Sequence, residues 1–341
     1  MKVVCHPGQR QHYPPHFLVN GVFEPNPEVP ERQDRLLRAA LDAGCRHEIT
    51  CEQGMEPIAA VHTAAYLSFL ERAWERWSRI PGAAPAVTPN IHPDRRDCGY
   101  PASVVAQAGY HMADASAPIA AGTWESILWS AWSAAQAAHL VRDGEPAAYA
   151  LCRPPGHHAF ADMAGGFSYQ NNTAIAAQLL RGVHERVAIL DVDLHHGNGT
   201  QGIFYRRGDV LTVSLHADPE RFYPFFWGWA NEVGEGEGAG CNLNLPLARG
   251  SGDAQFLAAL TTGIRRVQDF APGALVVALG LDASEHDPFG GLAVSAAGFG
   301  EIGRRIGAEL KLPTVIVQEG GYLCDALGGN LRQFLEGFGN A

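Results

Sequence analysis

The sequence lacks the features by which several classes of protein are recognised. No stretch of about 18 residues is both apolar and free of charge, so no membrane-spanning helix and no membrane partner are expected. The N-terminal residues 1–7 lack the long apolar segment of a signal peptide and predict a first strand. Basic runs do not exceed pairs such as Arg304-Arg305, and the net charge is −11, so tight nucleic-acid binding is not expected.

Cysteine is scarce and shows no pattern. The seven cysteines form no CxxC pair and no disulfide framework; they are Cys5, Cys45, Cys51, Cys98, Cys152, Cys241 and Cys324. Free thiols persist in reducing compartments, so we expect a cytoplasmic protein. The sequence also has no internal repeat and no low-complexity tail.

Apolar and helical patterns alternate along the chain. The 341 residues, of which 46% are hydrophobic, suffice for one large α/β domain or two smaller ones. Strands are expected at residues 3–5, 147–152, 187–191, 210–216, 274–279 and 314–317. Helices are expected at residues 31–43, 58–78, 122–142, 171–181, 253–270 and 296–310. This alternation predicts a single α/β domain over residues 1–341, with a largely parallel central sheet, helices on both faces and catalytic groups at the carboxyl ends of the strands.

Two long stretches show neither helical nor strand periodicity. Residues 81–121, rich in Pro, Ala, Gly and His, are expected to form an irregular inserted loop with a functional or interface role. Residues 218–240 carry six aromatic side chains, namely Phe222, Tyr223, Phe225, Phe226, Trp227 and Trp229. These aromatic residues predict either the rim of a pocket or the ordinary packing of a loop, and the sequence leaves both open.

The most informative segment runs from Asp191 to Gln201, DVDLHHGNGTQ, directly after the apolar residues 187–190. Burying even one unpaired charge costs several kcal/mol, so two carboxylates and two imidazoles at the end of a buried strand indicate a cation or a reaction. Asp193 and His195 lie two apart on an extended segment, so their side chains point to the same side. Carboxylate oxygen and imidazole nitrogen are ligands that a zinc-type ion binds.

Three more polar segments follow predicted strands. They are RPPGHH at residues 153–158, GLDASEHDP at residues 280–288 and QEGGY at residues 318–322. Each alone has a structural explanation as surface histidines, a capping aspartate or a packed tyrosine. Together, at equivalent strand ends of one parallel sheet, they favour an active site.

The strings RPPGHHA, DVDLHHGNGTQ, GLDASEHDP and EGGY resemble the motifs of the zinc-dependent histone deacetylase superfamily. Within it they are most similar to bacterial acetylpolyamine amidohydrolases and class II deacetylases. The resemblance covers nearly the whole chain, including Pro30-Glu31-Arg32 and Gly122-Thr123-Trp124-Glu125. It implies the arginase/deacetylase fold and an enzyme that hydrolyses linear amides.

The resemblance also implies roles for individual residues. Asp193, His195 and Asp282 match three zinc ligands that leave a position open for the substrate, with one zinc ion per subunit. The implied catalytic residues are His157, His158, Tyr322, Asp191 and Asn198. His157 and His158 move protons and are supported by Asp191 and Asn198 respectively, and which of them is base and which is acid stays open. Tyr322 matches the phenol that donates to the carbonyl oxygen. Asp191, Ser214 and Leu215 match a structural potassium site.

The implied substrates are small N-acetylated amines such as acetylpolyamines or acetylated diamines. The expected substrate contacts are Gly166, Phe167, Tyr223, Phe289, Ser116 and Trp227. The 81–121 segment resembles an insertion that narrows the substrate tunnel and builds a homodimer, so a homodimer is expected. Where the polyamine enzymes have an acidic residue, this chain has Ser116, with Asp114 two positions earlier, which predicts a weaker attraction for a polycation.

Several alternatives stay open at this point. A protein acetyl-lysine deacetylase or a broad small-amide amidase could use the same scaffold. A non-catalytic sensor of acetylated amines is disfavoured because every matched ligand and acid/base group is present. A binuclear manganese hydrolase of the arginase type is also disfavoured, because it needs carboxylates where this chain has Gly197 and Ser284.

Overall fold

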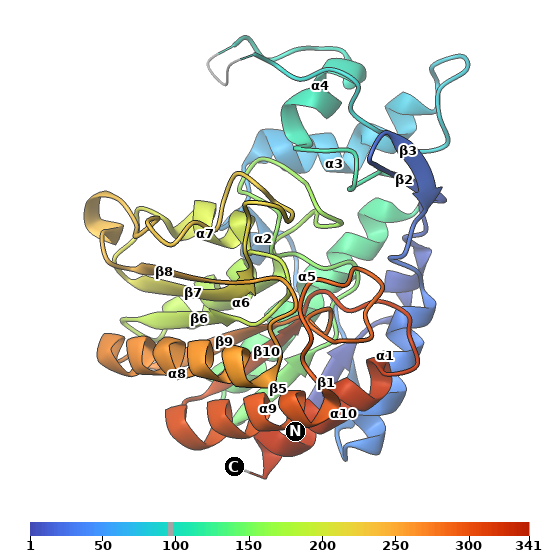
Figure 1. Ribbon diagram of the computed structural model, residues 1–341. Helices are drawn as coiled ribbons and strands as arrows, with labels where there is room; N and C mark the ends of the chain where they lie inside the picture. Colours follow the sequence, from blue (N-terminus) through green and yellow to red (C-terminus); the bar gives the residue numbers. More distant parts are fainter. Residues whose placement is uncertain (95–97, 341) are drawn as a thin grey trace.

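The computed structural model describes residues 1–94 and 98–340 and is built around one eight-stranded sheet (Figure 1). The strand order is β4-β1-β5-β10-β9-β6-β7-β8, and every neighbouring pair is parallel. The strands are β1 (Lys2–Cys5), β4 (Arg46–Ile49), β5 (Ala147–Ala150), β6 (Val187–Asp191), β7 (Val210–Ala217), β8 (Asn242–Leu247), β9 (Ala274–Leu279) and β10 (Thr314–Gln318). The expected largely parallel α/β architecture is confirmed.

Helices cover both faces of the sheet. One face packs against α1 (Glu31–Asp42), α8 (Asp253–Phe270), α9 (Ala296–Leu310) and α10 (Leu327–Gly339), and the other against α5 (Thr123–Arg142) and α6 (Asn172–Arg181). Alternate residues of a strand enter the two layers, so that Leu275 and Val277 face the first and Val276 faces the second. Because both faces are buried, the central strands appear in the sequence as continuous apolar runs.

The prediction of one continuous helix over residues 58–78 is wrong. The segment contains two helices, α2 (Glu56–Ala59) and α3 (Ala64–Trp77). Thr63 has an extended backbone, with φ −70° and ψ 147°, and its side chain accepts the N–H of Tyr66. An N-cap of this kind begins a new helix. The shorter elements are α7 (Asn198–Phe204) and the 3-10 turns η1 (Pro7–Gln11) and η2 (Gly236–Gly238).

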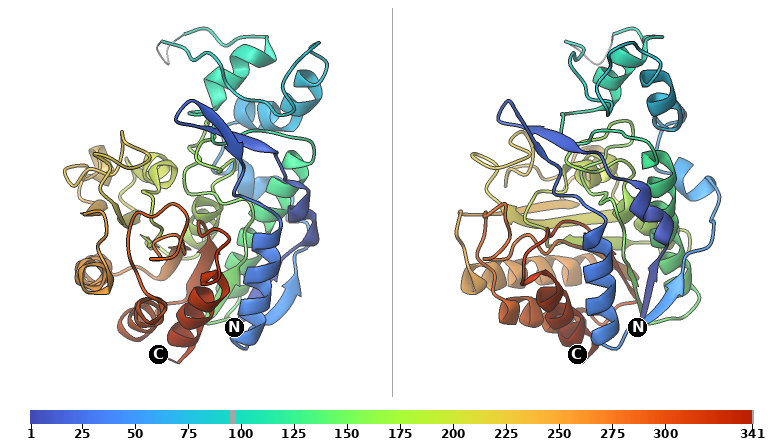
Figure 2. Two further views of the ribbon diagram at one scale, coloured as in Figure 1. Left: turned by 45° about the vertical axis from the view of Figure 1, so that its right-hand side comes forward. Right: turned by 90° about the vertical axis from the view of Figure 1, so that its right-hand side faces the viewer.

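A cap lies beyond the carboxyl ends of the strands, at the end of the molecule opposite the two termini (Figures 1 and 2). It contains α3, α4 (Val104–His111) and the hairpin of β2 (His16–Val19) and β3 (Val22–Pro25). The expectation that residues 81–121 are wholly irregular is therefore wrong, and residues 95–97 of that segment lie outside the described residues. Val104, Ala108 and Met112 recur at helical spacing and enter a small core with α3. Within the described ranges, no helix is both long and apolar enough to span a bilayer.

Candidate active site

The four polar segments meet at the carboxyl ends of the central strands. They follow β5, β10, β9 and β6, which are consecutive neighbours in the sheet. His157, Tyr322, Asp282 and Asp193, one residue from each segment, line a single cavity of about 690 Å³. The position of the cavity follows from the fold, because the carboxyl ends of parallel strands lie on the same side of the sheet and the loops that follow them converge there.

Three of the lining residues form a group that could hold a metal ion. Asp193, His195 and Asp282 are buried, and each offers a ligand atom within 4.8 Å of the others. Nδ1 of His195 lies 3.3 Å from Oδ1 of Asp193 and 3.1 Å from Oδ2 of Asp282. The backbone orients both carboxylates, since Asp193 accepts the N–H of Gly320 at 2.7 Å and Asp282 accepts the N–H of Leu194 at 3.0 Å.

The chemistry of this group fits a divalent cation. Burial raises the pKa of Asp282, and the nearby Asp193 raises it further. Two buried carboxylates that repel each other are stabilised when a cation lies between them. The backbone closes around them, because a Cβ at Gly320 would lie 2.1 Å from Oδ2 of Asp282. Gly197 and Ser284 offer no carboxylate for a second ion, and among the described residues this is the one group identified as a possible metal site.

The tandem histidines have partners of different charge. Nδ1 of His157 lies 2.9 Å from Oδ2 of Asp191, and Nδ1 of His158 lies 2.7 Å from Oδ1 of Asn198. Burial opposes a charge on His157, but Asp193 and Asp191 outweigh it and raise its pKa to about 10. Burial and the two neighbouring imidazoles hold the pKa of His158 well below its usual value. One imidazole is therefore strongly basic and the other weakly basic in the metal-free protein.

Tyr322 is buried among aromatic and charged neighbours. Its ring centroid lies 4.7 Å from that of Phe289 and 5.7 Å from that of Phe167, and the guanidinium of Arg32 lies 4.9 Å away. Its backbone N–H donates to Oδ2 of Asp287 at 2.9 Å. These contacts fix the ring while its side chain lines the cavity. Arg32 and Asp287 were not identified from the sequence as parts of the site.

The residues expected to contact the substrate all line the cavity, namely Gly166, Phe167, Tyr223, Phe289, Ser116 and Trp227. Gly166 has φ +50°, and a Cβ there would lie 2.5 Å from the ring of His158, so the close approach requires glycine. Phe17, on the hairpin strand β2, packs 5.4 Å from Phe167, centroid to centroid. Sequence reasoning missed Phe17 because only the tertiary fold brings this distant hairpin to the cavity.

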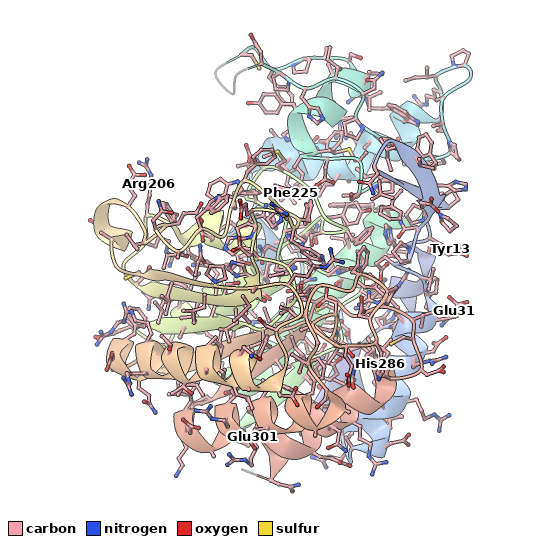
Figure 3. All side chains as sticks on the ribbon, in the orientation of Figure 1. Tyr13, Glu31, Arg206, Phe225, His286 and Glu301 are labelled. Atoms are coloured by element: carbon pink, nitrogen blue, oxygen red, sulfur yellow. The ribbon has the colours of Figure 1, made fainter. Side chains whose placement is uncertain are left out.

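The aromatic loop after β7 forms part of the cavity wall. Five of its six aromatic side chains line the cavity, and Trp229 does not. Figure 3 labels Phe225, which lies on the side of the sheet that faces α4. The hydroxyl of Tyr223 donates to Oδ2 of Asp114 at 2.7 Å, and Oδ1 of Asp114 accepts the N–H of Ser116 at 2.8 Å. Of the two interpretations of this loop, the pocket rim is correct for most of its aromatic residues.

The residues expected at a potassium site lie on adjacent strands. Asp191 ends β6 and pairs in register with Ser214 of β7, and Leu215 follows. Oδ1 of Asp191 accepts the N–H of Asp193 at 3.1 Å. The hydroxyl of Ser214 lies 2.8 Å from Nδ1 of His216. The structure thus places the three residues on two adjacent strands, with Asp191 two residues before Asp193 of the metal-ligand group.

Glu319 is a fully buried residue next to the site, and no role was predicted for it. Its Oε2 accepts the N–H groups of Gly156 and His157 at 2.7 and 3.0 Å, and its Oε1 accepts the hydroxyl of Thr173 at 2.6 Å. Burial raises its pKa to about 7. Glu319 therefore joins the loop that carries Tyr322 to the loop that carries the tandem histidines. The position of an acidic residue directly after a buried strand could have identified Glu319 from the sequence.

Replacing Glu319 by leucine is expected to lower the free energy of unfolding by about 3 kcal/mol, because three buried donors lose their acceptor. Urea-induced unfolding measures this change. Glu319→Gln is the matched control, since its amide oxygen can accept both N–H groups while its NH₂ donates to Thr173. Equal stability of the leucine and glutamine variants would contradict the role assigned to these hydrogen bonds.

Comparisons with known proteins identify the class to which this fold and site belong. The histone deacetylase domain model matches residues 26–338, so the chain belongs to the histone deacetylase family. This family is zinc-dependent, and Asp193, His195 and Asp282 are the possible zinc ligands here.

Individual relatives match over almost the full length. The acetylpolyamine amidohydrolase of Burkholderia pseudomallei is 50% identical over 340 residues, covering 99% of each chain. Acetylpolyamine amidohydrolase 1 of Pseudomonas aeruginosa is 44% identical over 337 residues, covering 97% of each. The crystal structure of an acetylpolyamine aminohydrolase from Burkholderia pseudomallei matches with a TM-score of 0.96 and 49% identity, covering 99% of this chain and 98% of that one. The family and the enzyme class expected from the sequence, a deacetylase or amidohydrolase, are confirmed.

Proposed function

We propose that the protein hydrolyses the acetyl group from small N-acetylated amines, of the acetylpolyamine and acetylated diamine type, to give acetate and a primary amine. The observation that carries this proposal is that the metal-ligand group, both tandem histidines and Tyr322 line one cavity. The names of the full-length relatives support a small acetylated amine as the substrate.

The side chains of the cavity hold the metal ion, transfer the protons and stabilise the developing negative charge. One zinc ion per subunit, held by Asp193, His195 and Asp282, would polarise the amide carbonyl and lower the pKa of a water molecule toward about 7. One imidazole of the tandem pair takes the proton of the attacking water, and an imidazole of the pair protonates the leaving amine. The hydroxyl of Tyr322 donates to the oxygen on which negative charge develops.

Three further assignments belong to the same proposal. A potassium ion at Asp191, Ser214 and Leu215 would hold the ends of β6 and β7 together and keep Asp191 aligned with His157. Residues 81–121 would act as the dimerisation and tunnel-narrowing element of a homodimer. The cytoplasm is proposed as the location, because the seven cysteines are all free.

A substrate panel tests the proposal. Purified zinc-loaded enzyme should hydrolyse acetylputrescine, acetylcadaverine and acetylspermidine faster than acetyl-lysine in long peptides, as measured by kcat/KM. Comparable rates on long peptides would favour the protein deacetylase or the broad amidase instead. Binding of acetylated amines without any hydrolysis would identify a sensor and reject the enzymatic proposal.

Replacing Asn198 by aspartate is expected to move one limb of the pH profile of kcat/KM to higher pH. A carboxylate near Nδ1 of His158 favours the protonated imidazole and raises the pKa of His158 by about one pH unit or more. If His158 acts as the base, the acid limb moves, and if it acts as the acid, the alkaline limb moves. The experiment therefore also assigns the two histidines. Asn198→Ala, which adds no charge, is the control, and an unchanged profile in Asn198→Asp would contradict the coupling of the two side chains.

A further inference from the structure

The carboxylates that line the cavity are few and already engaged. They are Asp193 and Asp282, which belong to the metal-ligand group, and Asp114. Both oxygens of Asp114 accept hydrogen bonds, from Tyr223 and from Ser116. Burial also raises the pKa of Asp114, although these hydrogen bonds oppose the shift. Among the described lining residues, no carboxylate is left free to bind a second ammonium group of a substrate.

Two guanidinium groups line the same cavity. Arg221 directly precedes Phe222 on the aromatic loop, and Arg249 follows β8. The N–H of Gly250 donates to the carbonyl of Gly291, and a Cβ at Gly291 would lie 2.9 Å from the ring of Phe222. The two arginines therefore lie on adjoining loops at the entrance.

Neither arginine is neutralised within the described part of the chain. Both side chains are exposed, and no described residue forms an ion pair or hydrogen bond with either guanidinium. Among the described residues that line the cavity, Arg221 and Arg249 are the only arginines and there is no lysine, although the protein as a whole carries a net charge of −11. A local excess of positive charge repels a polycation and attracts an anion to the cavity.

We propose that Arg221 and Arg249 form a subsite for a carboxylate at the outer end of the substrate. The preferred substrates are then acetylated amines that end in a carboxylate and carry no further amine, such as ω-acetamido carboxylates. Guanidinium groups bind carboxylates through charge-assisted and often bidentate hydrogen bonds. This inference rests on the proposed deacetylase function and ranks its substrates: acetylated diamines and polyamines are hydrolysed, but small acetylated amines with an anionic end are preferred.

Three amides of matched length test the subsite. 6-Acetamidohexanoate and N-acetylcadaverine share the acetamide and five methylene groups and differ in ending in a carboxylate or an ammonium group, and N-pentylacetamide is uncharged. With zinc-loaded enzyme at low ionic strength, kcat/KM should be highest for 6-acetamidohexanoate, by at least about fivefold over N-acetylcadaverine. The difference should shrink as salt is added, because salt screens exposed charges.

The double variant Arg221→Ala/Arg249→Ala should lose this preference. We expect KM for 6-acetamidohexanoate to rise at least about fivefold, while kcat/KM for N-pentylacetamide stays within about twofold. Arg206→Ala is the matched control, because Arg206 is also an exposed arginine, labelled in Figure 3, but does not line the cavity. This control should leave all three substrates unchanged.

Two results would overturn the subsite while leaving the proposed function intact. One is N-acetylcadaverine hydrolysed as well as or better than 6-acetamidohexanoate by the unmodified enzyme. The other is an equal change for all three amides in the double variant. If zinc-loaded enzyme hydrolyses none of the three, nor any acetylated polyamine, the proposed function fails and the subsite fails with it.

Discussion

Replacing Asp282 by alanine is expected to abolish zinc binding and to lower kcat/KM on the order of a thousandfold or more. Asp282 offers one of three ligand atoms that lie within 4.8 Å of one another. The remaining aspartate and histidine hold an ion far less tightly, and without it the amide carbonyl is not polarised. Zinc content by elemental analysis and the hydrolysis of acetylcadaverine measure the two effects.

The stability of this variant separates a lost ligand from a damaged fold. In the metal-free protein, Asp282 is a buried carboxylate beside Asp193, so its removal relieves a like-charge repulsion but leaves the N–H of Leu194 without its acceptor, and these two effects oppose each other. Metal-free Asp282→Ala should therefore unfold near the temperature of the metal-free parent, and added zinc should no longer raise its Tm. Glu285→Ala, on the same loop but exposed, is the control and should retain both zinc and activity. A zinc-replete, active Asp282→Ala would contradict the assigned metal site.

The sequence predicted the central strands well and missed the edge strands, for a physical reason. β9 is apolar throughout and β10 is apolar over residues 315–317, because both strands are buried on both faces. β4 reads Arg-His-Glu-Ile and is largely exposed at one edge, and β8 alternates asparagine and leucine at the other. Edge strands with polar positions carry no apolar run, so only the pairing with a neighbour reveals them.

Some residues of the candidate site could likewise be predicted from the sequence, and others could not. Asp193, His195 and Asp282 could be predicted because each lies at or just beyond the end of an apolar run, where the fold class places functional groups. Phe17 could not, because it comes from a distant hairpin that reaches the cavity through tertiary packing. Arg32 belongs to a segment that the resemblance covers, but its contact with Tyr322 exists only in the assembled fold. Local sequence patterns thus identify the metal ligands and catalytic residues, whereas a residue of the cavity wall such as Phe17 can be identified only from the assembled fold.

Replacing Tyr322 by phenylalanine is expected to lower kcat by about 10²–10³-fold while the zinc content and the stability stay unchanged. The ring keeps its contacts with Phe289, Phe167 and Arg32, so the only group removed is the hydroxyl. In the described part of the chain, that hydroxyl makes no hydrogen bond with another residue, so its loss breaks no bond of the folded state. Single-turnover kinetics on acetylcadaverine, with zinc analysis and thermal unfolding on the same samples, measures the three quantities.

Tyr149→Phe is the informative counterpart, because it removes the same atom from the core. The hydroxyl of Tyr149 donates to Oε1 of Gln318 at 2.7 Å, so this change should lower the free energy of unfolding by about 1 kcal/mol and leave kcat close to its normal value. The two variants should therefore show opposite patterns, with Tyr322→Phe affecting rate alone and Tyr149→Phe affecting stability alone. A normal kcat in Tyr322→Phe would mean that the developing negative charge is stabilised without this phenol, by the metal ion and the imidazoles.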